Sequence, residues 1–354
     1  MSLADFFSGR AGLRDFHPAA VLAVVFLLAY PLFASNFFTF QIGAYSLILG
    51  TIGLSLMMLA GYGGMVSLAQ LSVAGFAGYM VAILGDNSVG VMGLGWPWWL
   101  TVATSILAAA IFSAFIGAVS VRTEGIYTIM ITLAIAVAFF YFVRQNYVLF
   151  NGFTGFAGVA PPELFGVYWR DPAPFYYLCL LVAGGFFAAV VYGARATFGL
   201  GLQAIRDNPR RMRALGYNVT LHRIAAYFFS GLVAGTAGVL LVWFNGRISP
   251  GSVGVDVVID ILVITVVGGL RHPIGPFLGA LVFVLLENFA IDLIDRERFN
   301  TVIGTAFLLV VLFSPDGLLG LWERIRTKIR PKKEVWNRNN RTKGENLPAN
   351  EPAE

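Results

Sequence analysis

The sequence predicts an all-α fold, a polytopic helical membrane protein with about ten transmembrane helices. Of its 354 residues 58% are hydrophobic and only 12% are charged, whereas a soluble domain carries about 25% charged residues. The apolar residues also form blocks long enough to cross a bilayer, which takes about 20 residues per helix. A strand barrel would need alternating polar and apolar residues, and stretches such as 101–119 do not alternate.

The chain divides into three parts. Residues 1–18 form an N-terminal segment, 19–321 a transmembrane domain, and 322–354 a basic tail with too little apolar content to fold alone, which we expect to be disordered. Arg10 and Arg14 precede the first apolar block as in a signal peptide, but no A-x-A cleavage pattern follows, so we expect a retained helix. The predicted spans are 19–35, 42–60, 66–84, 98–120, 125–143, 174–194, 223–244, 255–270, 274–294 and 299–314.

The distribution of basic residues predicts the orientation. With a cytoplasmic N-terminus, the inner segments hold ten arginines, the tail adds nine Lys and Arg, and the outer segments hold five. Cytoplasmic loops of membrane proteins carry such an excess. We therefore expect a multi-pass protein of the bacterial inner (plasma) membrane with both termini in the cytoplasm, its basic tail lying against lipid headgroups.

Several chemistries have no residues to support them. The chain has one cysteine, Cys179, and its three histidines lack metal-ligand spacing. No hydrolase or metalloprotease motif occurs in any span. Every lysine lies in the tail and none follows a glycine, so a P-loop is impossible. We expect no enzyme activity, no cofactor, no metal and no nucleic-acid partner, and any ATP must be hydrolysed by another chain.

The longest internal cytoplasmic loop, 195–222, contains a predicted short helix at 209–215. Asn208 is a good N-cap, Pro209 suits the first helical position, and Gly216 suits the C-terminal cap. Such a helix either docks into a cleft on an ATPase through apolar anchors and basic residues, or is an ordinary positive-inside loop touching headgroups. The candidate coupling residues are Arg206, Asp207, Arg210, Arg211, Met212, Leu215 and Gly216.

Polar residues within the spans are few and are candidates for the translocation pathway. Pairs three or four residues apart, such as Ser67 with Gln70, share a helical face, and an ionisable residue in a span, such as Asp260, is a functional candidate. The alternatives are interhelical hydrogen bonding or, for Asp260, pairing with Arg247. The candidates are Ser67, Gln70, Ser72, Thr128, Thr132, Asp260 and Thr265.

Glycine and proline concentrate at two places, 61–64 and 268–279. Small residues let helices approach closely, and the same pattern recurs at Gly231, Gly235 and Gly238. Glycine and proline at membrane depth are also typical of broken helices that line a cavity. Both explanations, tight packing and broken helices, fit the sequence.

Several motifs, in order over about residues 45–322, resemble the LivM-type permeases of branched-chain amino acid ABC importers (the HAAT family). They are Gly61-Tyr-Gly-Gly-Met-Val-Ser-Leu-Ala-Gln70, Ala204-Ile-Arg-Asp-Asn208, Leu215-Gly-Tyr-Asn-Val-Thr220, Ser249-Pro-Gly-Ser-Val-Gly254, Asp260–Leu270, Gly275–Ala280 and Leu312–Gly320. Family members often have Ser-Leu-Gly-His where this chain has Ser67-Leu-Ala-Gln70, and often Glu at the position of Asp260.

The resemblance implies that 19–321 is a permease domain that works with a second homologous permease subunit (LivH-type), two ATP-binding subunits (LivG/LivF-type) and a periplasmic solute-binding protein. It also favours the coupling role of the 195–222 loop. The solute is then a branched-chain or related amino acid, or, as in other relatives, urea, an amide or an aromatic acid. The rival from another class is a stand-alone secondary transporter or channel, proton-coupled through Asp260.

Overall fold

The computed structural model describes residues 18–88, 93–123, 125–163, 166, 168–293, 304–305, 317 and 320. These residues are mostly helical, which confirms the all-α class. The N-terminal residues 1–17, most of the expected span 299–314 and the tail 322–354 lie outside the described residues.

The elements are α2 (Pro18–Phe33), η1 (Phe38–Ala44), α3 (Tyr45–Met57), η2 (Met58–Tyr62), α4 (Gln70–Leu84), α5 (Trp98–Ser120), α6 (Ile126–Gln145), α7 (Tyr147–Phe150), β1 (Phe156–Ala157), α8 (Pro172–Arg195), α9 (Thr197–Asp207), α10 (Pro209–Ala214), α11 (Val219–Asn245), β2 (Arg247–Ile248), η3 (Pro250–Val253), α12 (Val255–Gly268) and α13 (Gly275–Leu293).

Nine of the ten predicted spans coincide with helices, but not all of these helices are long enough to cross a membrane. Among the described residues, five helices are: Phe38–Tyr62 (η1, α3 and η2 in one run), α5, α6, α8 and α11. The expected number of about ten spans is therefore not confirmed. α4 has 15 residues, which at 1.5 Å per residue gives about 22 Å, short of the roughly 30 Å hydrocarbon core.

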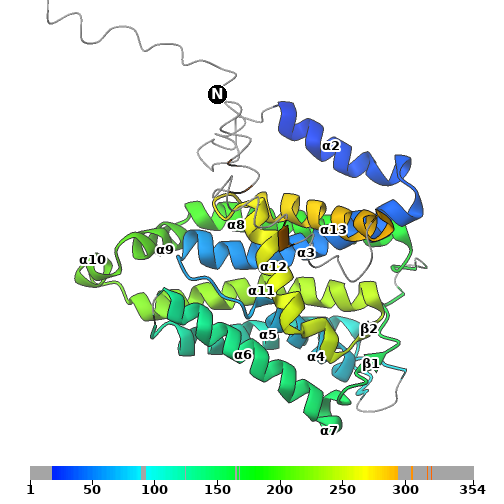
Figure 1. The fold of residues 1–354 in the computed structure, drawn as a ribbon, viewed down its shortest axis with the longest axis horizontal. Helices are drawn as coiled ribbons and strands as arrows, with labels where there is room; N and C mark the ends of the chain where they lie inside the picture. The colour runs from blue at the N-terminus through cyan, green and yellow to red at the C-terminus, as the bar shows by residue number, and fades with distance from the viewer. Residues whose placement is uncertain are drawn as a thin grey trace, which may run out of the picture.

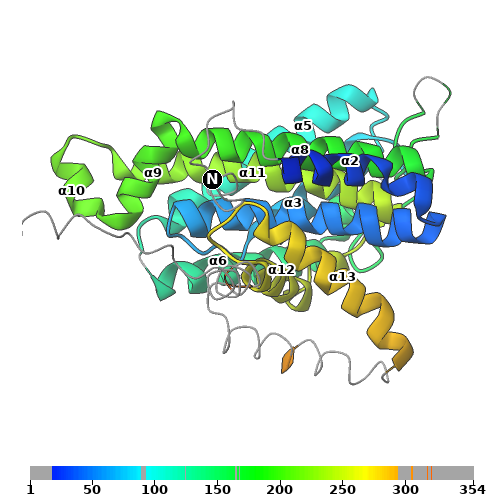
Figure 2. The same ribbon diagram turned by 90° about the horizontal axis from the view of Figure 1, so that it is seen from above.

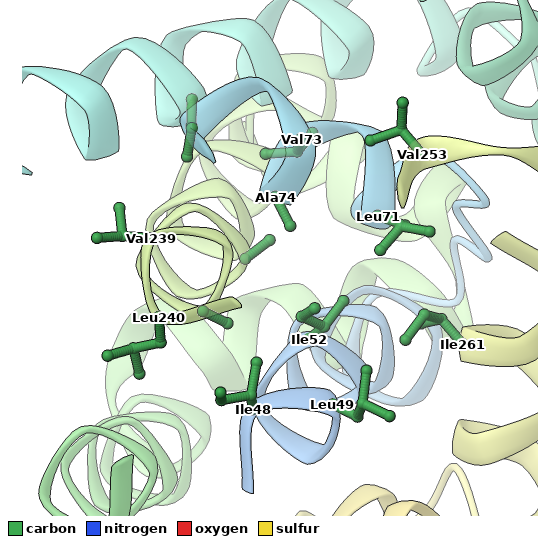
Figure 3. Packing of buried hydrophobic residues seen from close by; sticks show 14 of the residues in the cluster. Ile48, Leu49, Ile52, Leu71, Val73, Ala74, Val239, Leu240, Val253 and Ile261 are labelled. Carbon is green, nitrogen blue, oxygen red and sulfur yellow. The ribbon is translucent and has the colours of Figure 1, made fainter. Parts of the chain in front are cut away.

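The long helices lie side by side, with α11 in the middle of the bundle (Figures 1 and 2). α11 packs against α5, α4 and α3, and α13 packs against α3 and α12. The buried interior joins α3, α4, α11 and α12 through aliphatic side chains (Figure 3). Ile48 and Ile52 of α3, for example, are completely buried there.

The two ends of the bundle differ in structure. α9 and α10 project from one end, and the short strands β1 and β2 lie at the other (Figure 1). The strands pair antiparallel, with Phe156 opposite Ile248, and the amide of Ser88 donates to the carbonyl of Ala157. These contacts join three segments that the sequence placed on one side of the membrane, so they agree with the predicted alternation of the spans.

Small residues allow α11 to approach its neighbours. A methyl group at Gly231 would lie 2.5 Å from the Ser113 Cβ of α5, and one at Gly235 would lie 2.9 Å from the Ala109 Cβ. A methyl group at Gly238 would overlap the backbone carbonyl of Ala74 in α4. Close packing through these three glycines, predicted from the sequence, is therefore confirmed. Large apolar side chains instead point outward, as Ile111 and Phe115 of α5 do.

This packing predicts different effects for two Gly→Ala substitutions within helices. Gly238→Ala should lower the free energy of unfolding by about 1–3 kcal/mol, because overpacking forces the backbones of α11 and α4 apart. Gly184→Ala in α8 is the control, since a methyl group there meets nothing within 4 Å and should be neutral or stabilising by up to about 1 kcal/mol. The unfolding midpoints of both variants in detergent test this difference. Equal midpoints would contradict the packing argument.

Candidate coupling and translocation site

The segment between η2 and α4 is not helical although it lies inside the bundle. Residues 65–69 have no regular structure or form a turn, and Ser67 and Ala69 are completely buried. The amide of Met65 donates to the carbonyl of Leu59 at 3.0 Å, and that of Leu68 donates to the Thr132 hydroxyl of α6 at 3.1 Å. Non-helical backbone at membrane depth is tolerated where protein surrounds it. The first glycine-rich place is therefore a helix break.

The second glycine-rich place is a tight turn between two helices. α12 ends at Gly268 and α13 begins at Gly275. A methyl group at Gly268 would overlap the Gly275 carbonyl, and one at Gly279 would overlap that of Ile264. Here the glycines serve close packing between α12 and α13, in contrast to the break at 65–69.

The break carries a predicted pathway residue, Gln70, into a buried polar cluster. The Gln70 side-chain oxygen accepts from the Ser230 hydroxyl of α11 at 2.9 Å and from the Ser55 hydroxyl of α3 at 3.2 Å. The Ser230 hydroxyl also lies 3.1 Å from the Ser55 carbonyl. Because Gln70 is only 1% exposed, these bonds offset the cost of burying its amide. We define the polar cluster as Ser55, Ser67, Gln70, Thr132, Tyr227 and Ser230.

Some polar atoms of this cluster lack partners among the described residues. They include the Ser67 hydroxyl, the Gln70 side-chain nitrogen and the Tyr227 hydroxyl. The Tyr227 hydroxyl lies beside those of Ser67 and Ser120, but hydrogen-bond geometry does not join them. Buried polar groups are usually paired. The cluster can therefore donate and accept further hydrogen bonds when the surrounding helices move.

The other predicted pathway residues lie around this cluster or apart from it. Thr128 is one turn before Thr132, and the Thr132 hydroxyl donates to its carbonyl at 3.0 Å. Ser72 is buried in α4, and its hydroxyl has no partner in the described part of the chain. Thr265 of α12 packs against Gly53 of α3, and its hydroxyl donates to the Ile261 carbonyl within its own helix.

Asp260 belongs to a separate acidic group. It lies partly exposed on α12, within electrostatic reach of Asp256 on the same helix and of Glu287 on α13. Tyr45 of α3 is close to both Asp260 and Glu287. From the sequence, Glu287 in the predicted span 274–294 is a weaker candidate for a pathway or gating role than Asp260. The packing of α13 against α12 brings it near Asp260.

Two grooves lie beside the bundle, and neither is lined by a predicted pathway residue. The first, of about 300 Å3, lies between α5, α8 and α11, and its lining is apolar and includes Trp98, Trp169 and Trp243. The second lies at residues 36–41 and 168–172. The polar cluster is closed in this conformation because its side chains are at most 1% exposed, so the described helices would have to separate before a solute could reach it.

The candidate coupling segment, residues 195–222, contains the predicted short helix, α10, and a second helix, α9. α10 (Pro209–Ala214) is capped by Asn208, whose side chain accepts from the Arg211 amide at 3.0 Å, and Gly216 has a φ of +86°. These observations confirm the predicted caps. α9 was not predicted, although Phe198, Leu202 and Ile205 follow helical spacing. Its glycines obscured that signal.

The side chains of the coupling segment point in different directions. Arg210, Arg211 and Leu215 are exposed, the last to 67%. Met212 is buried against Ile205 and Val219, so it holds α9, α10 and α11 together and does not face outward. Asp207 forms an ion pair with Arg206 at 2.9 Å.

The polar cluster makes Ser230 a testable residue. Ser230→Ala removes a donor from the buried Gln70 oxygen and should lower the free energy of unfolding by about 1–3 kcal/mol. Thr236→Val in the same helix is the control, because the Thr236 hydroxyl donates to the Leu232 carbonyl of its own helix. The unfolding midpoints of the purified variants measure the difference. An equal effect of both substitutions would contradict the cluster as described.

A family model described as "Branched-chain amino acid transport system / permease component" matches residues 38–312. The chain is similar to the permease protein LivM of the high-affinity branched-chain amino acid transport system of Escherichia coli K12, with 25% identity over 322 residues, covering 84% of this chain and 74% of LivM. It is similar to the permease LivH of the corresponding Salmonella typhimurium system, with 25% identity over 282 residues, 76% of this chain and 90% of LivH. It also resembles the xylose transport permease XylH of Escherichia coli K12, with 30% identity over 165 residues, 45% of this chain and 38% of XylH.

No solved structure matches the chain. The family match covers most of the chain, and it includes α9, α10, the helix break and the polar cluster. The chain therefore belongs to the family of permease components of branched-chain amino acid transport systems, and it is a multi-pass membrane protein.

Proposed function

We propose that this chain is a permease subunit of an ATP-binding-cassette importer that carries branched-chain or related amino acids across the bacterial inner membrane. Its partners in this proposal are a second homologous permease, two ATP-binding subunits and a periplasmic solute-binding protein. The binding protein delivers solute to the outer mouth of the permease pair. ATP-driven closure of the ATP-binding subunits then moves α9 and α10, and the pair changes from an outward-facing to an inward-facing state.

The observation that carries the proposal is the exposed tip formed by α10 and the turn after it. The tip presents two arginines, Arg210 and Arg211, beside the apolar side chains of Leu215 and Tyr217. A partner can bury the apolar groups while charged groups set the orientation of docking. Because the sequence has no P-loop of its own, a chain driven by ATP needs such a docking surface.

The proposed orientation places this tip in the cytoplasm. The basic residues of α9, α10 and their flanks support it through the positive-inside rule. The glycine-rich residues 61–64 before the break and the turn at 269–274 lie at the same end of the bundle, since a methyl group at Gly61 would contact the Leu270 carbonyl. β1 and β2 then lie on the periplasmic side, where the binding protein docks.

The nature of the solute follows from relatives and from the polar cluster. LivM and LivH belong by name to branched-chain amino acid systems. The hydroxyl and amide groups of the polar cluster suit a neutral or zwitterionic solute, which can share hydrogen bonds without bringing an uncompensated charge into the membrane. An importer of urea, amides or aromatic acids is the alternative within the same class.

Reconstitution of the two permeases and the two ATP-binding subunits in liposomes, with the binding protein added, tests the proposal. We expect ATP-dependent uptake with a binding protein loaded with leucine, isoleucine or valine. Binding proteins for urea, xylose and an aromatic acid form the comparison panel. Accumulation by the lone chain along a proton gradient, without ATP, would instead establish a secondary transporter.

The docking tip yields a prediction of its own. Reversing both charges in Arg210→Glu/Arg211→Glu should weaken association with the ATP-binding subunits and lower ATP-driven uptake by about tenfold or more. A partner surface that attracts two arginines repels two glutamates. Co-purification and uptake measure the two effects. Arg247→Glu at the opposite end of the bundle is the control and should leave the assembly with the ATP-binding subunits intact. Unchanged uptake in the double variant would argue against this docking surface.

A further inference from the structure

One guanidinium joins the coupling segment to the helix break. Arg206, near the end of α9, donates through Nη1 to the backbone carbonyl of Gly61 in η2. Its Nε and Nη2 both bond the Asp207 carboxylate, at 3.0 and 2.9 Å. The side chain of Arg206 is 41% exposed and points back toward its own bundle. Its guanidinium thus contacts Gly61 and Asp207 of the same chain, whereas Arg210 and Arg211 are exposed on α10.

The backbone of the break passes directly beside this arginine. Gly64 has a φ of +66°, and a methyl group there would lie 2.6 Å from the Arg206 Cγ. A methyl group at the neighbouring Gly63 would lie 3.6 Å from Leu202 Cδ1 of α9. Both the conformation and the space at residue 64 thus favour glycine. α9 and this part of the chain therefore meet through side-chain packing as well as through the hydrogen bond from Arg206 to Gly61.

α9 and α10 are in turn joined to each other. Ile205, Met212 and Val219 form a small apolar cluster that links α9, α10 and the start of α11. Ile205 is completely buried. A force applied at the tip of α10 therefore reaches Arg206 through packed side chains, because packed interiors transmit strain.

The break leads from this contact to the polar cluster within a few residues. Ser67 is six positions after Gly61, and the Leu68 amide holds the Thr132 hydroxyl of α6. Residues 65–69 have no helical hydrogen-bond ladder. They can change conformation without unwinding a helix, so a displacement at Gly61 can reorient Ser67 and Gln70.

We propose that Arg206 is a positioning residue that transmits movement of α9 and α10 to the helix break and thereby to the polar cluster. This role rests on the proposed importer function and differs from docking, since Arg206 acts within the permease. Asp207 orients the guanidinium, and Gly64 provides the space for its side chain.

The test uses the complete importer in liposomes with the Arg206→Gln variant. Assembly with the ATP-binding subunits should persist, because the tip of α10 is unchanged, while solute moved per ATP hydrolysed should fall at least about fivefold, the lower end of typical coupling between sites. Arg206→Lys should restore part of the uptake, since an ammonium also donates to a carbonyl. Arg122→Gln, a matched loss of charge in the turn between α5 and α6, should match the wild type.

Two results would overturn the role of Arg206 while the wild-type importer works. One is an unchanged ratio of uptake to hydrolysis in Arg206→Gln. The other is a loss of ATPase assembly equal to that of Arg210→Glu/Arg211→Glu, which would make Arg206 a docking residue. A wild-type complex without ATP-driven uptake is a different result, because it would remove the importer function itself.

A double-mutant cycle tests the contact independently of transport. Gly64→Ala should lower the unfolding midpoint, and Arg206→Ala should recover part of this loss, since it removes the Cγ and Cδ atoms that the new methyl group meets. Contacting residues give such non-additive effects. Fully additive shifts of the midpoint would overturn the proposed contact between Arg206 and the break.

Discussion

The need to satisfy buried backbone groups in the non-helical stretch 65–69 shapes much of the surrounding structure. Outside a helix, these amides and carbonyls must find partners on other elements. Thr132 of α6 supplies an acceptor for Leu68, and Arg206 of α9 supplies a donor for the Gly61 carbonyl just before the stretch. The break therefore fixes where α6 and α9 can lie, and it turns a local interruption into a junction of distant segments.

The same junction explains how short helices fit into this protein. α4 spans too few residues to cross the membrane alone, but it is almost wholly buried between α11, α5 and α3. The glycines of α11 let it approach at backbone distance. α5, α6 and α8 each leave much of their surface outside the bundle, where lipid can cover it. α5, α6 and α8 thus form the outer wall, and α4 can begin inside the protein at the polar cluster.

The sequence predicted those features that depend on local chemistry. The apolar blocks predicted the helices, and the residues Asn208, Pro209 and Gly216 predicted α10 with its caps. The sequence of the glycine-rich motifs could not decide between tight packing and a broken helix, because both need the same residues. The structure shows close packing at Gly268 and a helix break directly after Gly64. Met212 could equally have faced a partner, and its burial depends on Ile205 and Val219. The bond between Gln70 and Ser230 joins residues 160 positions apart and depends on how α4 and α11 pack.

A helix break between a coupling segment and a closed polar cluster has a mechanical consequence. If residues 61–84 formed one continuous helix, a movement at its cytoplasmic end would shift the whole rod against α11, where the Gly238 contact leaves no room for sliding. The non-helical joint at 65–69 separates the packing of α4 against α11 from movement at the cytoplasmic end. α4 stays packed against α11, while Ser67 in the joint and Gln70, the first residue of α4, can exchange partners among the hydroxyls around them. The packing of α11 thus gives the reason why the interruption lies where it does, before the residues at which α4 meets the α11 backbone, such as Ala74 opposite Gly238.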